Sequence, residues 1–319
     1  MLESGLRVPS RRAARNMLRP TSVPSLVLAL AVLLPGCSIR KTAVNKIGDA
    51  LAETGSNFAS DEDPELVGEA IPFGLKTMEG LLETSPKHEG LLLAASSGFV
   101  QYAYGWVQME ADVVEAKDLA RATELRERAR KLYLRARNYG MRGLEVDFPG
   151  LATALARDPK TALGKTKKEH VPLLYWTAMG WAGAMSLKVN DSEVSADQPI
   201  VEALARRALE LEPCWGLGSV HEFFVSWESA RSSIGGSVEK ARGHYDAALA
   251  CAGGRRAFPH VTFAESVSVA KQDKAQFQEM MEKALAVDVS RPDDQRLANL
   301  LAQKRARWQL GRLDELFIE

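Results

Sequence analysis

Most of the chain after Asp49 carries apolar residues at intervals of three and four positions, the spacing of one face of an α-helix. Residues 118–140 show this pattern clearly, and Arg126 and Arg130 lie off the apolar stripe. Alternating apolar and polar residues, which mark a half-buried strand, are scarce. We therefore predict an all-α domain. The stripe in 118–140 consists of Leu119, Ala122, Leu125, Ala129, Leu132, Tyr133 and Ala136.

Several predicted helices end with similar phrases, at 80–86, 143–149, 208–213, 248–253 and from 284 onward. In each phrase a small residue precedes Leu, and in most a Pro or Gly ends the helix. The spacings are about 40 and 36 residues late in the chain and about 64 earlier, close to one and two periods of the tetratricopeptide repeat of about 34 residues. Coincidence among helices rich in Ala and Leu is the alternative. We favour degenerate tetratricopeptide-like (TPR-like) helical hairpins, roughly four of them, that stack as a solenoid and leave a groove or an enclosed channel along one side.

Two prolines and one loop bear on the predicted helix boundaries. Pro72 either kinks a helix or marks its start, because proline lacks the N–H that a helix interior needs. Pro172 suits the first turn of the helix that follows it. The loop from Phe148 to Lys168 contains Pro, Gly and Lys and is expected to hold only a short helix.

The first 36 residues have the order of a bacterial secretory signal: a basic segment, a short apolar core and small residues before a processing site. The apolar core from Leu26 to Leu34 is less than half the length of about 20 residues that a bilayer-spanning helix needs. Leu34, Pro35 and Gly36 lead directly into Cys37, which resembles a lipobox, although Pro35 departs from its usual residue. We expect lipidation of Cys37; a plain signal with an incidental cysteine is the alternative.

The expected lipid anchor divides the chain into three parts. Residues 1–36 are a signal peptide that is removed, 37–50 form the lipidated tether and 51–319 form the helical-repeat domain. Further acylation of the new amino terminus gives an anchor with several acyl chains, which holds a protein stably on a membrane. The body then lies in the periplasm, and Ser38 after the cysteine favours the outer membrane.

Composition adds two expectations. The 41 basic and 41 acidic residues balance, so a nucleic-acid partner is not expected. Cys214 and Cys251 could pair in an oxidising compartment. However, each ends a different predicted helix, and Cys251 occupies a position that holds Leu or Val in the other phrases. We therefore favour two small buried hydrophobic residues over a disulfide.

Each partial match to a catalytic motif in this sequence lacks at least one required residue. GLGSVH at 216–221 has His221 in place of the third glycine of a dinucleotide loop, and LGKT at 163–166 follows Pro159 in place of a leading glycine. His221 and Glu222 begin like a zinc-protease helix, but Val225 stands at the second ligand position. The other histidines lack partners at metal-ligand spacing, and no GxSxG motif is present. We expect no enzymatic activity, metal or cofactor.

Two segments carry many aromatic residues in otherwise aliphatic helices. LLYWTAMGWAGAM contains two glycines that thin the helix surface, and SVHEFFVSWESAR places aromatic and polar residues on adjacent turns. Either the rings fill wide gaps between helices, or they line a cavity for an apolar or amphipathic ligand. In the second case His221, Glu222 and Arg231 fix the ligand's head; a hydrogen-bond network between repeats is their other interpretation. The candidate ligand-binding residues are Tyr175, Trp176, Trp181, His221, Glu222, Phe224, Trp227 and Arg231.

A third segment, GFVQYAYGWVQ at 98–108, places Phe99, Tyr102 and Trp106 three to four residues apart on one helix face. Here we favour packing against the core over ligand binding.

Several phrases resemble those of the TRAP transporter T-component lipoproteins, the TatT family. The likeness runs in order from about residue 40 to the C-terminus, and its phrases are not general helical-repeat consensus. They are ELVGEAIPFGLKTMEGLL, LLLAASSGFVQYAY, ARKLYLRARNYGMRGLEV, VPLLYWTAMGWAGAMSL, HEFFVSWESAR with IGGS after it, and RLANLLAQKRARWQLGRLDELF.

This resemblance implies a periplasmic, lipid-anchored homotrimer with cryptic TPR repeats. Such a protein associates with the solute-binding protein of a tripartite ATP-independent periplasmic (TRAP) transporter and handles a hydrophobic or acidic small molecule. It is not an enzyme, and the resemblance assigns no residue a role. The alternative function is an envelope scaffold whose groove binds protein segments.

Overall fold

The computed structural model describes residues 35–53, 55–188, 196–231 and 235–318. Nearly all of the expected signal peptide, and the side chain of Cys37, lie outside these described residues. The chain divides into two compact units, Met1–Ala43 and Val44–Glu319. What is described of the first unit is the beginning of helix α2.

The described residues contain helices and no strand, which confirms the all-α prediction. The longer helices are α2 (Pro35–Glu53), α4 (Pro64–Thr84), α5 (Glu89–Tyr102), α7 (Leu119–Asp147), α10 (Val171–Ser186), α12 (Gln198–Leu211), α13 (Ser219–Ala230), α14 (Val238–Ala252), α16 (Lys274–Leu285) and α17 (Arg296–Leu310). The short α-helices are α3 (Gly55–Ala59), α6 (Met109–Val114), α8 (Leu151–Arg157), α9 (Pro159–Ala162), α15 (Phe258–Phe263) and α18 (Leu313–Leu316). Two π-helices, η1 (Ala103–Gln108) and η4 (Ala264–Ser268), and two 3₁₀ turns, η2 (Lys168–His170) and η3 (Trp215–Leu217), complete the described elements.

Local chemistry explains several of the boundaries. The Asp63 carboxylate accepts hydrogen bonds from two backbone N–H groups of the first turn of α4, and Pro64 follows at the first helical position. Pro72 lies inside α4 rather than at its start. Pro172 lies in the first turn of α10, as predicted. Gly253 ends α14 in the left-handed conformation with a φ of 56°.

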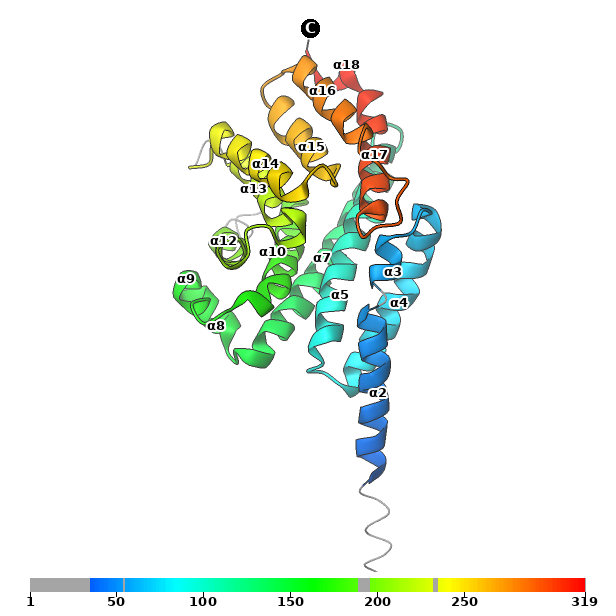
Figure 1. Ribbon diagram of the computed structural model, residues 1–319, viewed down its shortest axis with the longest axis vertical. Coiled ribbons are helices and arrows are strands. Elements are labelled where there is room, and N and C mark those ends of the chain that lie inside the picture. Colours follow the sequence, from blue (N-terminus) through cyan, green and yellow to red (C-terminus); the bar gives the residue numbers. More distant parts are fainter. Residues whose placement is uncertain (1–34, 54, 189–195, 232–234, 319) are drawn as a thin grey trace, which may run out of the picture. The chain divides into compact units, whose positions relative to one another are not determined.

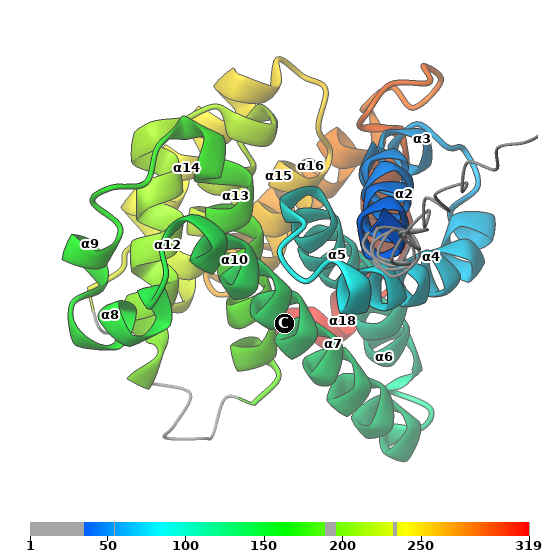
Figure 2. The ribbon, with the colours of Figure 1, turned by 90° about the horizontal axis from the view of Figure 1, so that it is seen from below.

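Helices that follow one another pack together in the unit Val44–Glu319. Contacts run from α4 to α5, α5 to α7, α7 to α10 and α10 to α12, and then from α13 to α14 and α16 to α17. Figures 1 and 2 show α5 and α7 between α4 on one side and α10 on the other. Helix α17 contacts both α3 and α4, so the end of the chain returns to the first helices of this unit.

Three apolar cores lie between the packed helices. The first joins α4, α5 and α7 around residues such as Leu92 and Phe99. The second joins the end of α7 to α10, α12 and α13 around residues such as Leu174 and Leu204. The third lies between α13 and the C-terminal helices and includes Phe277.

The prediction for the two cysteines was wrong. Cys214 and Cys251 form a disulfide with an S–S distance of 2.07 Å, and Cys214 is exposed rather than buried. The turn before α13 lies beside the last turn of α14 because these two helices pack along each other. The disulfide therefore joins the start of one helix to the end of the next.

Candidate functional site

Three aromatic rings from α10 and η3 meet inside the unit Val44–Glu319. The ring centroid of Tyr175 lies 5.0 Å from that of Trp176 and 4.7 Å from that of Trp215, and the two tryptophans are 6.4 Å apart. All three side chains keep part of their surface accessible. They form a set of rings at the boundary between the first and second cores.

A charged pair lies beside these rings. The guanidinium of Arg256 donates to the carboxylate of Glu222 at 2.5 Å, and Thr262 Oγ1 donates to the other carboxylate oxygen at 3.2 Å. Arg256 is 8% exposed and also donates to the carbonyl of Leu217 at 3.4 Å. That carbonyl belongs to a turn in which Leu217 itself has a positive φ of 54°, a costly conformation outside glycine. The turn thus presents a backbone acceptor to Arg256.

Two phenols approach the same carboxylate. Burial raises the pKa of Tyr104 and of Tyr175, and the charge of Glu222 adds to the increase in both. Yet both side chains retain accessible surface. The Tyr104 hydroxyl forms no hydrogen bond within the described part of the chain. We call Tyr104, Tyr175, Trp176, Trp215, Glu222 and Arg256 the interior site.

A second charged cluster, centred on Arg305, lies next to the Tyr104 ring. Arg305 on α17 donates to Asp112 at 3.0 Å and to Glu265 at 2.5 Å, and its guanidinium carbon lies 5.9 Å from the Tyr104 ring centre. Burial by itself would lower the pKa of Arg305, but the charges around it raise that pKa overall. Tyr104 and Glu265 both lie in π-helices, which are rare and frequent at functional sites. Arg305 therefore ties the two π-helices together.

Three of the other candidate residues, His221, Phe224 and Trp227, lie on α13, and Arg231 directly follows this helix. His221 Nδ1 lies 2.9 Å from His244 Nδ1, so one imidazole donates to the other. The ring of Phe224 stacks on that of His244 at 5.0 Å. Arg231 lies 5.2 Å from the Trp227 ring centre and forms an ion pair with Glu202. Among the described residues, the buried donors Trp227 Nε1 and Arg231 Nε have no hydrogen-bond partner.

Trp181 lies apart from both the interior site and the α13 residues. Its Nε1 donates to Asp197 at 2.9 Å, and the guanidinium of Arg137 lies 5.0 Å from its ring centre. The structure thus brings Tyr175, Trp176 and Glu222 together and separates them from the other candidate residues. As ligand-binding residues, all of them stay a prediction.

Sequence reasoning missed Tyr104, Trp215 and Arg256. Tyr104 is part of the aromatic segment 98–108, but regular helical spacing selects Phe99, Tyr102 and Trp106, and the π-helix turns Tyr104 elsewhere. Trp215 follows Cys214 in a turn, where helical periodicity gives no signal. The adjacent glycines and Pro213 were the available sign of a structured turn.

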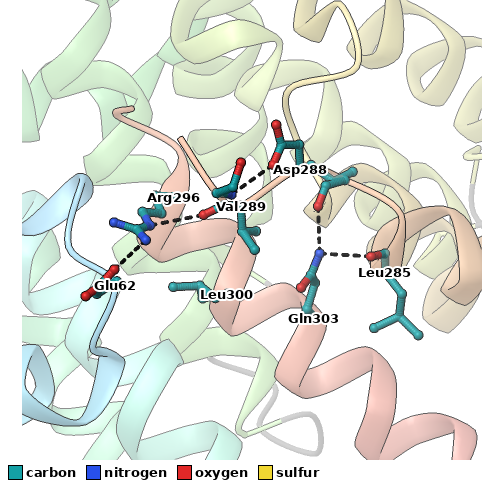
Figure 3. Close-up of a pocket in the computed structure, with 9 residues that line it drawn as sticks. Glu62, Leu285, Asp288, Val289, Arg296, Leu300 and Gln303 are labelled. Carbon is teal, nitrogen blue, oxygen red and sulfur yellow. Dashed lines mark hydrogen bonds and ion pairs between the residues drawn. The ribbon is translucent and has the colours of Figure 1, made fainter. Parts of the chain in front are cut away.

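A separate groove of about 580 Å³ lies between the end of α16, the following loop and residue Glu62 (Figure 3). Arg296 donates to the carbonyl of Val289 at 3.0 Å and to the Glu62 carboxylate at 2.5 Å. Gln303 Nε2 donates to the carbonyls of Leu285 and Val287. The side-chain nitrogens of this groove are thus already engaged with the protein.

Among the described residues, no three His, Cys, Asp or Glu side chains are grouped so that they could hold a metal ion. Likewise, none of the described helices combines the length and the apolar character needed to cross a membrane.

Residues 60–317 match the model of a protein family described as the TRAP transporter T-component. An uncharacterised protein of Treponema pallidum (strain Nichols) is 27% identical over 310 residues, which cover 91% of this chain and 96% of that protein.

Proposed function

Since the chain belongs to the TRAP transporter T-component family, we propose that it docks the solute-binding protein of a TRAP system and holds a small apolar or amphipathic ligand at the interior site. Membership of this family places it among accessory components of transport, and the docking and the ligand are the proposed steps. A T-component is consistent with a position in the periplasm or envelope.

The accessible rings of the interior site carry the ligand proposal. Tyr175, Trp176 and Trp215 offer apolar ring faces, which suit the body of an apolar ligand. The Tyr104 hydroxyl, which lies near the Glu222–Arg256 pair, offers a hydrogen-bonding group for a polar head. Because the pair is neutral as a whole, the ligand that fits best carries a neutral or zwitterionic head.

The proposal is for binding without catalysis. The interior site holds phenols, rings and one ion pair, and the Glu222 carboxylate is already bonded to Arg256 and Thr262. A general base needs a free acceptor within hydrogen-bond reach of the proton that it removes. The arrangement therefore favours holding a molecule over changing it.

The proposal includes a lipid anchor at Cys37, retention on the periplasmic face of the outer membrane and assembly as a homotrimer. It also includes cryptic TPR-like stacking, which the packing of successive helices from α4 to α12 supports. Labelling with a palmitate analogue tests the anchor: the wild type incorporates label and Cys37→Ser does not. Equal labelling of both would refute lipidation at this residue.

Docking is tested by surface plasmon resonance with a TRAP solute-binding protein of the same organism. We expect saturable binding by the detergent-extracted protein and no binding to a solute-binding protein of an unrelated importer. Absence of binding to every TRAP solute-binding protein of that organism would refute the docking role.

One observation favours the alternative function of an envelope scaffold. The groove of Figure 3 is lined in part by Leu285, Val287, Val289 and Leu300, which suit an extended protein segment. Co-purification of an outer-membrane assembly protein, lost when Leu300 is changed to Asp, would support the scaffold over the transport role.

A further inference from the structure

The Cys214–Cys251 disulfide connects two of the segments that build the interior site. Cys214 directly precedes Trp215, whose ring centre lies 4.7 Å from that of Tyr175. Cys251 lies in the last turn of α14, and the segment that follows this helix contains Arg256. The disulfide therefore joins the turn that carries Trp215 to the segment that carries Arg256.

The Arg256 segment has supports of its own on α17. The Ala257 N–H donates to Asn299 Oδ1 at 2.9 Å, and Asn299 Nδ2 donates to the carbonyl of Arg255 at 2.8 Å. Asn299 is 2% exposed, and hydrogen bonds in such surroundings are stronger than those in water. These bonds hold the backbone on both sides of Arg256 independently of the disulfide.

The hydrogen bonds that shape the Trp215 turn are local. The Trp215 N–H donates to the Glu212 carbonyl, and the Gly218 N–H donates to the Trp215 carbonyl. Such bonds set the shape of the turn but do not fix it against a neighbouring helix. The bond from the Arg256 guanidinium to the Leu217 carbonyl does reach another segment, but at 3.4 Å it is long for a hydrogen bond.

The backbone of this turn also has an unusual conformation. Gly216, Leu217 and Gly218 have positive φ values of 56°, 54° and 86°. A leucine in this region persists only where its surroundings enforce it. Gly218 packs tightly on α14, where an added Cβ would lie 2.9 Å from the Ala248 carbonyl oxygen. Because glycine permits wide changes of φ and ψ, residues 214–217 can swing about Gly216 and Gly218 once the disulfide opens.

The disulfide lies where a thiol can attack it. Cys214 is exposed, and so are Pro213 and Gly216 beside it. Exposed disulfides are reduced more readily than buried ones. A thiolate of a dithiol reductant attacks the Cys214 sulfur and forms a mixed disulfide, while Cys251 leaves as a thiolate and takes up a proton. The second thiol of the reductant then attacks the mixed disulfide, so that the reductant leaves as a disulfide and the protein keeps two thiols.

From this arrangement we infer that the Cys214–Cys251 disulfide is a redox gate of the interior site: the oxidised protein holds the ligand, and reduction by a dithiol releases it. This inference rests on the proposed function, which supplies the ligand. After reduction the turn holds the Trp215 ring against Tyr175 in only a fraction of the molecules. The apparent affinity for the ligand falls in proportion to that fraction.

The test is native mass spectrometry of the full chain, extracted gently from its membrane, with and without dithiothreitol. We expect the fraction of protein that carries a bound small-molecule mass to fall at least about tenfold on reduction. Cys214→Ala with Cys251→Ala should carry equally little of this mass with and without the reductant. Maleimide labelling of a separate aliquot verifies that both cysteines of the reduced wild type are free.

Amide hydrogen exchange distinguishes a local gate from unfolding of the whole unit. Reduction should speed exchange in residues 212–218 and leave exchange in α17 unchanged, because α17 supports the site without the disulfide. If loss of the bound mass is accompanied by equally faster exchange in α17, the ligand is lost by unfolding and the inference is overturned.

The outcomes separate this inference from the function on which it rests. If the oxidised wild type carries no bound mass, the proposed ligand-holding function itself fails. If it carries a mass that remains after verified reduction, the function stands and the disulfide is not a gate. Unchanged exchange in residues 212–218 also overturns the inference, because the turn is then held without the disulfide.

Discussion

At the scale of single residues, neighbours in the chain have very different surroundings. Arg255 is an exposed residue that pairs with Asp293 and Asp294 at the surface, whereas Arg256 is buried and holds Glu222. An ion pair at the surface contributes little to stability. A buried charge that loses its partner is costly.

Arg256→Met should therefore lower the free energy of unfolding by roughly 3 kcal/mol, because it leaves the Glu222 carboxylate unpaired. Arg255→Met, the matched control, should change it by less than about 1 kcal/mol. Urea unfolding measures both. Equal effects of the two substitutions would contradict the burial of the interior pair.

Two histidines are expected to make stability depend on pH. Burial lowers the pKa of His244 to about 4, with a further contribution from His221, and burial likewise lowers the pKa of His260 to about 4. In the unfolded chain the pKa of histidine is about 6.5. The unfolded state therefore binds more protons between these values, and stability falls as pH falls from about 6.5 to about 4.

His244→Gln should reduce this loss by on the order of 3 kcal/mol, since the variant has one fewer group to protonate on unfolding. Urea unfolding at pH 7, 5 and 4 provides the measurement. A variant whose stability falls as steeply as that of the wild type would show that His244 does not carry the effect.

At the scale of elements, the contact between α7 and α10 depends on glycine. A Cβ atom added at Gly180 would lie 2.7 Å from the backbone nitrogen of Arg137, and one added at Gly183 would meet the Tyr133 ring at 2.7 Å. Gly180 and Gly183 therefore allow α10 to pack close to α7. Gly74 on α4, by contrast, has nothing within 4 Å of the added atom.

Gly180→Ala should destabilise the protein by about 1–3 kcal/mol, because the two backbones must separate. Gly74→Ala should instead stabilise it by up to about 1 kcal/mol through helix propensity. Thermal unfolding of both variants gives the comparison. The close approach of the two helices is refuted if both substitutions stabilise the protein.

Sequence reasoning was sufficient for elements whose signal is local. Periodicity gave the helices, and Pro172 gave the start of α10. The π-helix that contains Tyr104 and the turn that contains Trp215 break the regular spacing, so these two of the six interior-site residues had no periodic signal. The disulfide depends on α13 packing along α14, a tertiary contact that the spacing of Cys214 and Cys251 does not reveal.

At the scale of the whole unit Val44–Glu319, the interior site depends on several packed layers at once. Its residues come from η1, α10, η3, α13 and Arg256, two residues before α15, and the Arg305 guanidinium on α17 lies 5.9 Å from the Tyr104 ring centre. The disulfide fixes the turn from which Trp215 and the Leu217 carbonyl arise. Stability and the geometry of the site are therefore linked.

Reduction of the disulfide should lower the free energy of unfolding by about 2–4 kcal/mol, because the unfolded chain regains the freedom of a loop that spans 37 residues. Cys214→Ala with Cys251→Ala should reproduce the loss without reductant. Urea unfolding with and without dithiothreitol supplies the test. If reductant destabilises the double variant as much as the wild type, the disulfide is not the cause.

The central claim, that the interior site holds a ligand, is tested most directly by native mass spectrometry of the protein after gentle extraction from its own membrane. We expect a bound small-molecule mass in the wild type, greatly reduced in Tyr104→Phe with Tyr175→Phe. The mass should persist in Tyr102→Phe with Tyr139→Phe, which removes two hydroxyls that bond to Arg128 and Glu79 outside the interior site. A wild type without any bound mass, or a mass retained equally by both double variants, would contradict the account.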